Sequence, residues 1–361
     1  MAVEAGTRLG RFVVREYIGQ GTLGIVYRAE DPAAGTVAVK VLHRLADPEN
    51  RERFQEAAPR LVAVRHPGLV AALDQGEHDE VPYLVQEHAD AVTLAERFRR
   101  ATMNPSAVMA ILRGMAAAID HAHAEGLVHG NLKPAQVLLT AGDRALVSDF
   151  GLAPLRRPRL AGLAVGFRDG TPEYLAPEQV VGGEPTAATD RYAFAAIAYQ
   201  LLVDRAPFEG DPQSVMNAHL RTEPVPPSRR NRALPPAVDA VLLRGLAKDQ
   251  PARWPACEEL VAELARALGL ASAPRSERLA RPPSWRWPLI AAAAAVATAV
   301  VVALVFVASG RGRGPEHAAR VTSSGCHVTM TVTPRPDTAL PRPRLRPGMR
   351  ASSSVLNVCC R

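Results

Sequence analysis

The stretch GQGTLGIVYRAE at residues 19–30 decides the fold, because it places three glycines between two strand-like runs. Gly19, Gly21 and Gly24 have the spacing G-x-G-x-x-G, which a dinucleotide-binding fold follows with a helix. Here a second strand-like run follows instead, so we expect the glycines to lie in a hairpin. Small residues at a hairpin tip allow backbone N–H groups to approach phosphates closely. Lys40 ends the next strand-like run and is one of three lysines among 43 basic residues, so a specific role is expected for its compact ammonium group.

The wider pattern of the chain predicts two unequal parts. Strand-like runs separated by Gly, Pro and Asp occupy residues 8–90. From about residue 93 the apolar residues recur with helical period, as in DRYAFAAIAYQLLV at residues 190–203. A small β-rich part before a larger helical part is typical of an α+β fold with two lobes. With 361 residues, 47% of them hydrophobic, and only 4 cysteines, the chain is neither a disordered protein nor a disulfide scaffold.

Further motifs follow the glycine-rich stretch in order. They are VAVK at 37–40, LVQEH at 84–88, HGNLKPAQVLL at 129–139, DFG at 149–151, GTPEYLAPE at 170–178 and TDRYAF at 189–194. Their order and spacing resemble the protein kinase family, specifically bacterial membrane-anchored (Hanks-type) serine/threonine kinases. The resemblance covers residues 8 to about 266, and we therefore predict a two-lobed kinase-like domain at residues 8–268.

The resemblance implies a site for ATP and Mg²⁺. It implies that Lys40 holds the α- and β-phosphates and is itself held by a carboxylate on the first helix. Glu56 is the best candidate, although its spacing to His66 is one residue long and Pro59 is unwelcome within a helix. Asp149 is expected to bind Mg²⁺ between the β- and γ-phosphates. The other expected ATP-binding residues cover the phosphates, enclose the adenine or bind its edge through the backbone: Ile18, Gly19, Gly21, Gly24, Val26, Ala38, Leu138, Glu87 and Ala89.

Two structural pairings are also implied. Asp190 in TDRYAF is expected to anchor the catalytic loop, and Arg253 is expected to pair with Glu178. Lys133 and Thr171 occupy positions that mark the serine/threonine type rather than the tyrosine type.

The catalytic loop departs from the family pattern. Where the family has His-Arg-Asp, this chain has His129, Gly130 and Asn131. The family's aspartate accepts or orients the substrate proton, whereas the neutral amide of Asn131 cannot act as a base near pH 7. Losing a positioned general base costs roughly 10²–10⁴ in rate. The family's second Mg²⁺ ligand, an asparagine, is replaced by Gln136, whose extra methylene misplaces its oxygen in an octahedral site.

The sequence also predicts no control by phosphorylation of an activation loop. Gly130 replaces the arginine that receives the phosphate of an activation loop, and residues 152–170 contain no Ser, Thr or Tyr. One explanation, no control by activation-loop phosphorylation, covers both losses.

These residues predict an ATP-binding pseudokinase or very weak kinase, which acts as a scaffold or allosteric regulator on a protein partner that the sequence does not name. One alternative is an active serine/threonine kinase in which Asn131 is tolerated, because the substrate hydroxyl loses its proton late in a loose transition state. A second alternative is an interaction module that works without nucleotide.

A membrane anchor is expected after the domain. The uncharged run at residues 289–308 meets the roughly 20 residues that a bilayer span needs, and an alanine-rich buried helix is the alternative. Tryptophans and arginines flank the run, and the arginine bias mildly favours a cytoplasmic kinase-like domain. Residues 269–288 are predicted to be a Pro/Ser/Arg-rich linker, and residues 309–361 an extracytoplasmic, disordered Arg/Pro-rich tail.

The tail also explains the charge. It carries nine arginines and two acidic residues, which accounts for the whole net charge of +7, so no nucleic-acid groove is expected in the domain. Cys257 is expected to be a small buried hydrophobe. Cys326, Cys359 and Cys360 hint at an intermolecular disulfide in the tail. No metal site beyond nucleotide-bound Mg²⁺ is expected.

Overall fold

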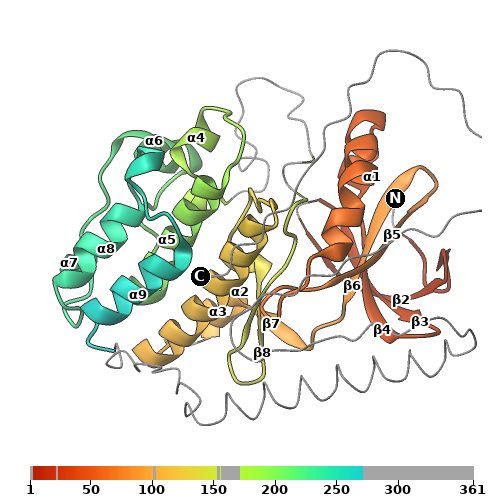
Figure 1. The fold of residues 1–361 in the computed structure, drawn as a ribbon, viewed down its shortest axis with the longest axis horizontal. Coiled ribbons are helices and arrows are strands. Elements are labelled where there is room, and N and C mark those ends of the chain that lie inside the picture. Colours follow the sequence, from red (N-terminus) through yellow and green to blue (C-terminus); the bar gives the residue numbers. More distant parts are fainter. Residues whose placement is uncertain (1–2, 22, 101–102, 153–154, 156–170, 271–361) are drawn as a thin grey trace, which may run out of the picture. The chain divides into compact units, whose positions relative to one another are not determined.

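A computed structural model describes residues 3–21, 23–100, 103–152, 155 and 171–270 (Figure 1). Strands β1–β6 and helix α1 form one lobe, and the helices from α3 onward form the other, with the expected α+β character. The strands are β1 (Arg8–Leu9), β2 (Phe12–Gln20), β3 (Ile25–Asp31), β4 (Gly35–Val41), β5 (Ala72–His78), β6 (Val81–Glu87), β7 (Ala91–Thr93), β8 (Val137–Thr140) and β9 (Ala145–Val147). The α-helices are α1 (Pro48–Ala63), α2 (Leu94–Arg100), α3 (Pro105–Ala124), α4 (Pro177–Val180), α5 (Ala187–Val203), α6 (Pro212–Arg221), α7 (Pro227–Arg230), α8 (Ala237–Gly245) and α9 (Cys257–Ala267).

The small lobe is built on an antiparallel sheet with the strand order β1-β2-β3-β4-β6-β5. The glycine-rich stretch connects β2 to β3, which confirms the predicted hairpin. Its turn is closed by Gly21, whose N–H donates to the carbonyl of Gly24 at 2.8 Å. Gly24 lies against β4 so closely that a Cβ would stand 1.8 Å from the Val41 carbonyl oxygen, and only glycine fits there.

Helix α1 begins at Pro48, where the Asp47 side chain caps the Asn50 N–H at 3.2 Å. Phe54, Ala58 and Leu61 form its buried stripe at the spacing of one helix face. Pro59 lies on the exposed face and donates no backbone hydrogen bond, and the helix nevertheless continues to Ala63.

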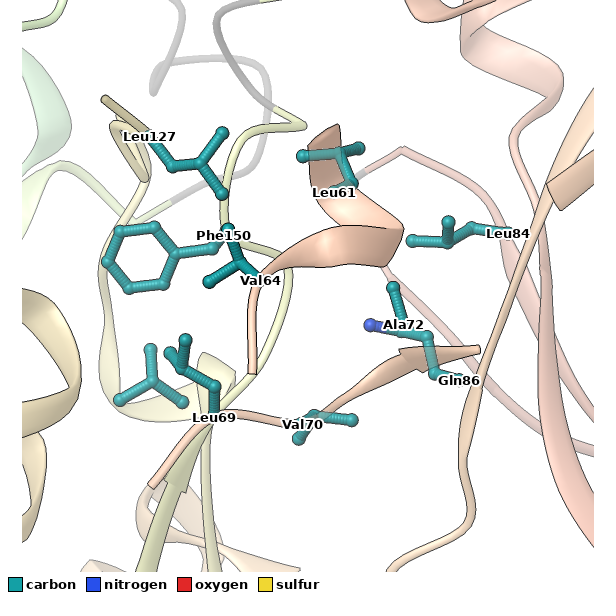
Figure 2. Close-up of a pocket in the computed structure, with 10 residues that line it drawn as sticks. Leu61, Val64, Leu69, Val70, Ala72, Leu84, Gln86, Leu127 and Phe150 are labelled. Atoms are coloured by element: carbon teal, nitrogen blue, oxygen red, sulfur yellow. The ribbon is translucent and has the colours of Figure 1, made fainter. Parts of the chain in front are cut away.

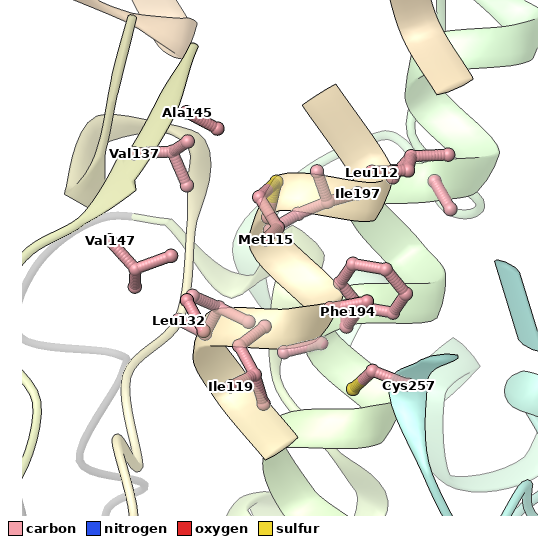
Figure 3. Packing of buried hydrophobic residues seen from close by; sticks show 14 of the residues in the cluster. Leu112, Met115, Ile119, Leu132, Val137, Ala145, Val147, Phe194, Ile197 and Cys257 are labelled. Carbon is pink, nitrogen blue, oxygen red and sulfur yellow. The ribbon is translucent and has the colours of Figure 1, made fainter. Parts of the chain in front are cut away.

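The large lobe packs around α5, in which 14 of 17 residues are buried. Figure 3 shows Met115 and Ile119 of α3 facing Phe194 and Ile197 of α5. Cys257 at the start of α9 joins the same core and is 1% exposed, which confirms the expected small buried hydrophobe. Burial raises the pKa of its thiol well above the usual value.

Among the residues described, no helix has both the length and the apolar character to cross a membrane. The predicted span at 289–308 and the tail with Cys326, Cys359 and Cys360 lie outside those residues, as do residues 156–170 and all but the first two residues of the predicted linker.

Candidate active site

An ion pair joins the two lobes at the base of the cleft. The Nζ of Lys40, near the end of β4, contacts Oδ2 of Asp149, which follows β9. Both groups are deeply buried, at 3% and 8% exposure. Asp149 has a left-handed backbone with φ of 61°, which is uncommon outside glycine and holds the carboxylate toward Lys40. The ammonium expected at the phosphates and the carboxylate expected at the metal therefore lie side by side.

The expected partner of Lys40 is different in the structure. Glu56 is exposed on α1, and Lys40 pairs with Asp149 instead. The reason is the phase of the helix: Glu56 stands two residues after the buried Phe54, about 200° around the axis. The predicted ion pair of Lys40 with Glu56 is therefore wrong for the conformation that the structure shows.

The glycine-rich hairpin covers this ion pair. A Cβ on Gly21 would lie 3.2 Å from the Lys40 Nζ, so the backbone approaches the ammonium as closely as glycine permits. Register places Val26 directly opposite Lys40, and Ala38 lies two residues before it, so all three share a sheet face. Val26, Ala38 and Leu138 are half-buried, whereas Ile18 is 46% exposed. These positions suit walls of an open cleft.

The backbone positions expected at the adenine edge lie at the junction of the lobes. Glu87 ends β6 and Ala89 follows it, and both are half-buried. The Glu87 N–H donates to the Ala71 carbonyl at 2.9 Å, which fixes this segment. Their role in binding stays a prediction.

The catalytic loop is held from below by Asp190 of α5. Its buried carboxylate accepts the N–H of His129 at 2.7 Å and the N–H of Gly130 at 2.8 Å, and contacts Nε2 of His123 at 2.8 Å. Gln179 donates its amide to the Gly130 carbonyl at 2.8 Å. The expected anchoring role of Asp190 is confirmed, because its carboxylate binds two backbone N–H groups of the loop.

Asn131 follows in the same loop as a neutral group. Its side chain is half-buried, and its N–H lies 3.4 Å from Nδ1 of His129. Nearby, the Nζ of Lys133 lies 3.3 Å from Oγ1 of Thr171, so the structure brings together the two residues that mark the serine/threonine type.

Gln136, the second expected metal ligand, has a hydrogen-bond partner that the sequence did not reveal. The Ser148 hydroxyl lies 3.1 Å from Oε1 of Gln136 and 3.2 Å from its carbonyl oxygen. The Ser148 N–H also donates to that carbonyl at 2.9 Å. Since Ser148 immediately precedes Asp149, Gln136 lies beside the metal-binding motif, with its amide engaged by the serine.

Behind the cleft lies a small cavity of about 30 Å³. Figure 2 shows that the side-chain nitrogen of Gln86 points into it, among apolar residues that include Leu61 of α1 and Phe150. Phe150 packs against His129, with ring centroids 5.1 Å apart. Helix α1, the DFG motif and the catalytic loop thus share one packed interior.

The expected pair of Glu178 and Arg253 is confirmed. Two guanidinium nitrogens of Arg253 bind the two carboxylate oxygens at 2.9 and 2.8 Å, and the arginine side chain is fully buried. Burial acts to raise the pKa of the Glu178 carboxyl. The hydrogen bonds and charge of Arg253 outweigh burial and hold that pKa below its ordinary value.

Residues 12–263 match the family described as the protein kinase domain. The chain belongs to the protein kinase family. It is 34% identical over 263 residues to a probable serine/threonine-protein kinase of Streptomyces coelicolor, which covers 70% of this chain and 39% of that protein. It is also 34% identical over 268 residues to serine/threonine-protein kinase PknB of Mycobacterium tuberculosis, covering 71% of this chain and 42% of that protein.

The kinase domain of Mycobacterium tuberculosis PknI has a similar solved structure, with a TM-score of 0.60 and 27% identity over 74% of this chain and 100% of that chain. The relatives therefore establish a two-lobed serine/threonine kinase family member. The chain spans less than half of the length of the two curated relatives named above.

The residues present suit a nucleotide with a metal ion. A buried ammonium and carboxylate lie beneath a glycine backbone that no larger residue could replace without a shift. Within the described part of the chain, no cluster of three His, Cys, Asp or Glu side chains could hold a metal alone. A metal here would depend on Asp149, with phosphate oxygens and Gln136 as further oxygen donors.

Proposed function

We propose that this protein is a membrane-anchored, ATP-binding member of the serine/threonine kinase family in which phosphotransfer is weak or absent. The kinase-like domain would face the cytoplasm and act on partner proteins by its nucleotide-dependent conformation. The observation that carries the proposal is the neutral Asn131, in a catalytic loop whose anchoring contacts to Asp190 are all present.

The nucleotide-holding half supports binding. Bound ATP with Mg²⁺ would supply the transferable phosphoryl group and the metal's charge. Lys40 offers an ammonium to phosphate oxygens, Asp149 offers a carboxylate to the metal, and Gly21 offers a close backbone above them. Because Lys40 and Asp149 neutralise each other in this structure, a ligand has to replace one buried ion pair with two new ones.

The transfer half supports weak chemistry. Asn131 can hold a substrate hydroxyl by hydrogen bonding but cannot take its proton near pH 7. Gln136 keeps one lone pair of Oε1 for a metal while Ser148 occupies the other side. The catalytic loop therefore keeps the geometry that would position a substrate hydroxyl, but it lacks a base to take the proton of that hydroxyl.

Thermal melting of the full chain with ATP and Mg²⁺, beside a radiolabelled phosphate-transfer assay on a generic protein substrate, tests this function. We expect stabilisation without transfer, and no stabilisation in Asp149→Asn. Transfer that disappears in Asp149→Asn would overturn the proposal in favour of an active kinase. The absence of any stabilisation would indicate an interaction module that works without nucleotide.

The active-kinase alternative has one observation in its favour. The contact of Lys133 with Thr171 at 3.3 Å keeps the substrate-side contact of the serine/threonine type. The transfer assay above decides between the two.

Membrane anchoring is proposed on the uncharged run at residues 289–308 alone. Cell fractionation should place the chain in the membrane fraction, resistant to carbonate extraction, and a deletion of this run should release it. Recovery of the intact chain in the soluble fraction would overturn the anchor.

A further inference from the structure

Gln136 is held by Ser148 through both its backbone and its side chain. The Ser148 N–H donates to the Gln136 carbonyl at 2.9 Å, and the Ser148 hydroxyl donates to Oε1 of Gln136 at 3.1 Å. Gln136 is only 7% exposed, so its amide has little room to turn. The oxygen that would have to meet a second metal ion is therefore a neutral acceptor that already receives a hydrogen bond.

The charges around this oxygen are unfavourable for an additional cation. Lys133 lies three residues before Gln136 and is 7% exposed, and Lys40 is buried beside Asp149. Asn131 and Gln136 add no charge. The cleft and the catalytic loop thus set two ammonium groups against one carboxylate at the positions where the resemblance places phosphates and metal.

Three further ionisable groups near the cleft do not change this balance. Glu56 is exposed on α1, and Asp190 lies beneath the loop, where it accepts the N–H groups of His129 and Gly130. The imidazole of His129 is buried, and burial lowers its pKa, so it is neutral at pH 7. Neither carboxylate is therefore placed beside Gln136 to attract a second ion.

We infer that this protein binds ATP with one divalent metal ion, held by Asp149 and the phosphate oxygens, where the family holds two. Mg²⁺ in nucleotide sites is bound through carboxylates together with phosphate oxygens. A second ion would be repelled by both ammonium groups and would find a neutral amide in place of a carboxylate. The inference rests on the proposed ATP binding and adds the metal content of that site. It does not depend on whether phosphate is transferred.

Electron paramagnetic resonance of Mn²⁺ tests the inference, because free Mn²⁺ gives the signal and bound Mn²⁺ is lost from it. The full chain, in excess over a non-hydrolysable ATP analogue, is titrated with Mn²⁺. We expect the wild type to bind about one Mn²⁺ per bound analogue. The variant Gln136→Glu keeps the length of the side chain and adds only the charge, and we expect it to bind about two.

Two neutral variants are the matched controls. Gln136→Asn shortens the side chain to the length of the family's asparagine, and Ser148→Ala removes the hydrogen bond to Oε1. Neither substitution adds a carboxylate, so both variants should still bind about one Mn²⁺ per analogue.

The ion count in the wild type is decisive, and it needs no substitution that could disturb folding. Two ions per analogue, or none, would overturn the inference, while binding of the analogue would still support the proposed function. One ion in a folded Gln136→Glu variant, or two in either neutral variant, would overturn charge as the reason. Thermal melting shows whether each variant is folded. Failure of the analogue to bind in calorimetry would overturn the proposed function and this inference with it.

Discussion

The cleft side of the small lobe and the catalytic loop of the large lobe differ in which charges they keep. At the cleft, Lys40 and Asp149 supply the two buried charged groups that we propose to hold a nucleotide and its metal. The catalytic loop keeps the ammonium of Lys133 and is anchored by the buried carboxylate of Asp190 from α5, whereas Asn131, at the position of the family's aspartate, is neutral. The contacts that hold the catalytic loop and the group that would carry its chemistry therefore belong to separate residues.

This separation has an energetic basis. Asp190 satisfies two buried N–H groups, and its loss would leave them unpaired at about 1–3 kcal/mol each. The two contacts of Asp190 with the loop backbone do not involve the Asn131 side chain. These contacts can therefore persist when the base is gone.

Breaking the buried ion pair of Arg253 with Glu178 should have the largest effect on stability. Arg253→Met leaves the carboxylate of Glu178 buried without its partner, and we expect a loss of about 3–5 kcal/mol in the free energy of unfolding. Urea denaturation measures it. The control is Arg266→Met, which removes an arginine that is 60% exposed and should cost about 1 kcal/mol or less. Equal losses in the two variants would contradict a frame built on buried contacts.

Removing the Lys40 ammonium, which we propose to hold the phosphates, should remove the stabilisation of the fold by ATP. The wild type should gain about 2.7 kcal/mol at an ATP concentration 100 times its Kd, and Lys40→Met should gain almost nothing. Thermal or urea unfolding with and without ATP and Mg²⁺ gives both values. Lys248→Met is the matched control because it removes a lysine of the large lobe that bonds the Ala218 carbonyl rather than Asp149. A full gain in Lys40→Met would contradict the assigned site.

Acid should weaken the large lobe through His219. Burial, and then the charge of Lys248, lower its pKa to about 3. Below pH 6.5 the unfolded chain binds a proton that the folded chain does not, so stability is full above 6.5 and falls as the pH drops toward 3. At pH 5.5 this costs about 1.4 kcal/mol.

Urea denaturation at pH 7.5 and 5.5 should therefore show a difference that is smaller by that amount in His219→Gln than in the wild type. An identical pH dependence in both proteins would mean that His219 is not held neutral. In the wild type, Nδ1 of His219 lies 2.9 Å from the Tyr192 hydroxyl.

The smallest effect is expected for Glu56. Because it is exposed and Lys40 pairs with Asp149, Glu56→Gln should change the free energy of unfolding by no more than about 0.5 kcal/mol. The stabilisation by ATP should also be unchanged. Loss of that stabilisation in Glu56→Gln would show that α1 turns inward when nucleotide binds, and would restore the sequence-based pairing.

The sequence was sufficient for the fold because its motifs appear in order and each demands a particular element. The hairpin at Gly21, the anchor at Asp190 and the pair of Glu178 with Arg253 are all present in the structure. Each of these rests on a residue type whose chemistry is hard to replace at a fixed position along the chain.

The sequence was insufficient where the rotational phase of a helix, or a contact between residues in different elements, decides which side chains meet. The apolar spacing of Phe54, Ala58 and Leu61 could have shown that Glu56 lies away from the core. The contact of Ser148 with Gln136 joins residues 12 apart through a loop, and no local pattern announces it.

The most direct test measures ATP affinity and phosphate transfer together, in the wild type and in Asn131→Asp. We expect ATP dissociation constants that agree within about twofold, since Asn131 belongs to the transfer half, and a transfer rate roughly 10²–10⁴ higher in the variant. Equal transfer by the two proteins, or an affinity for ATP that appears only with the aspartate, would contradict the separation of the two halves.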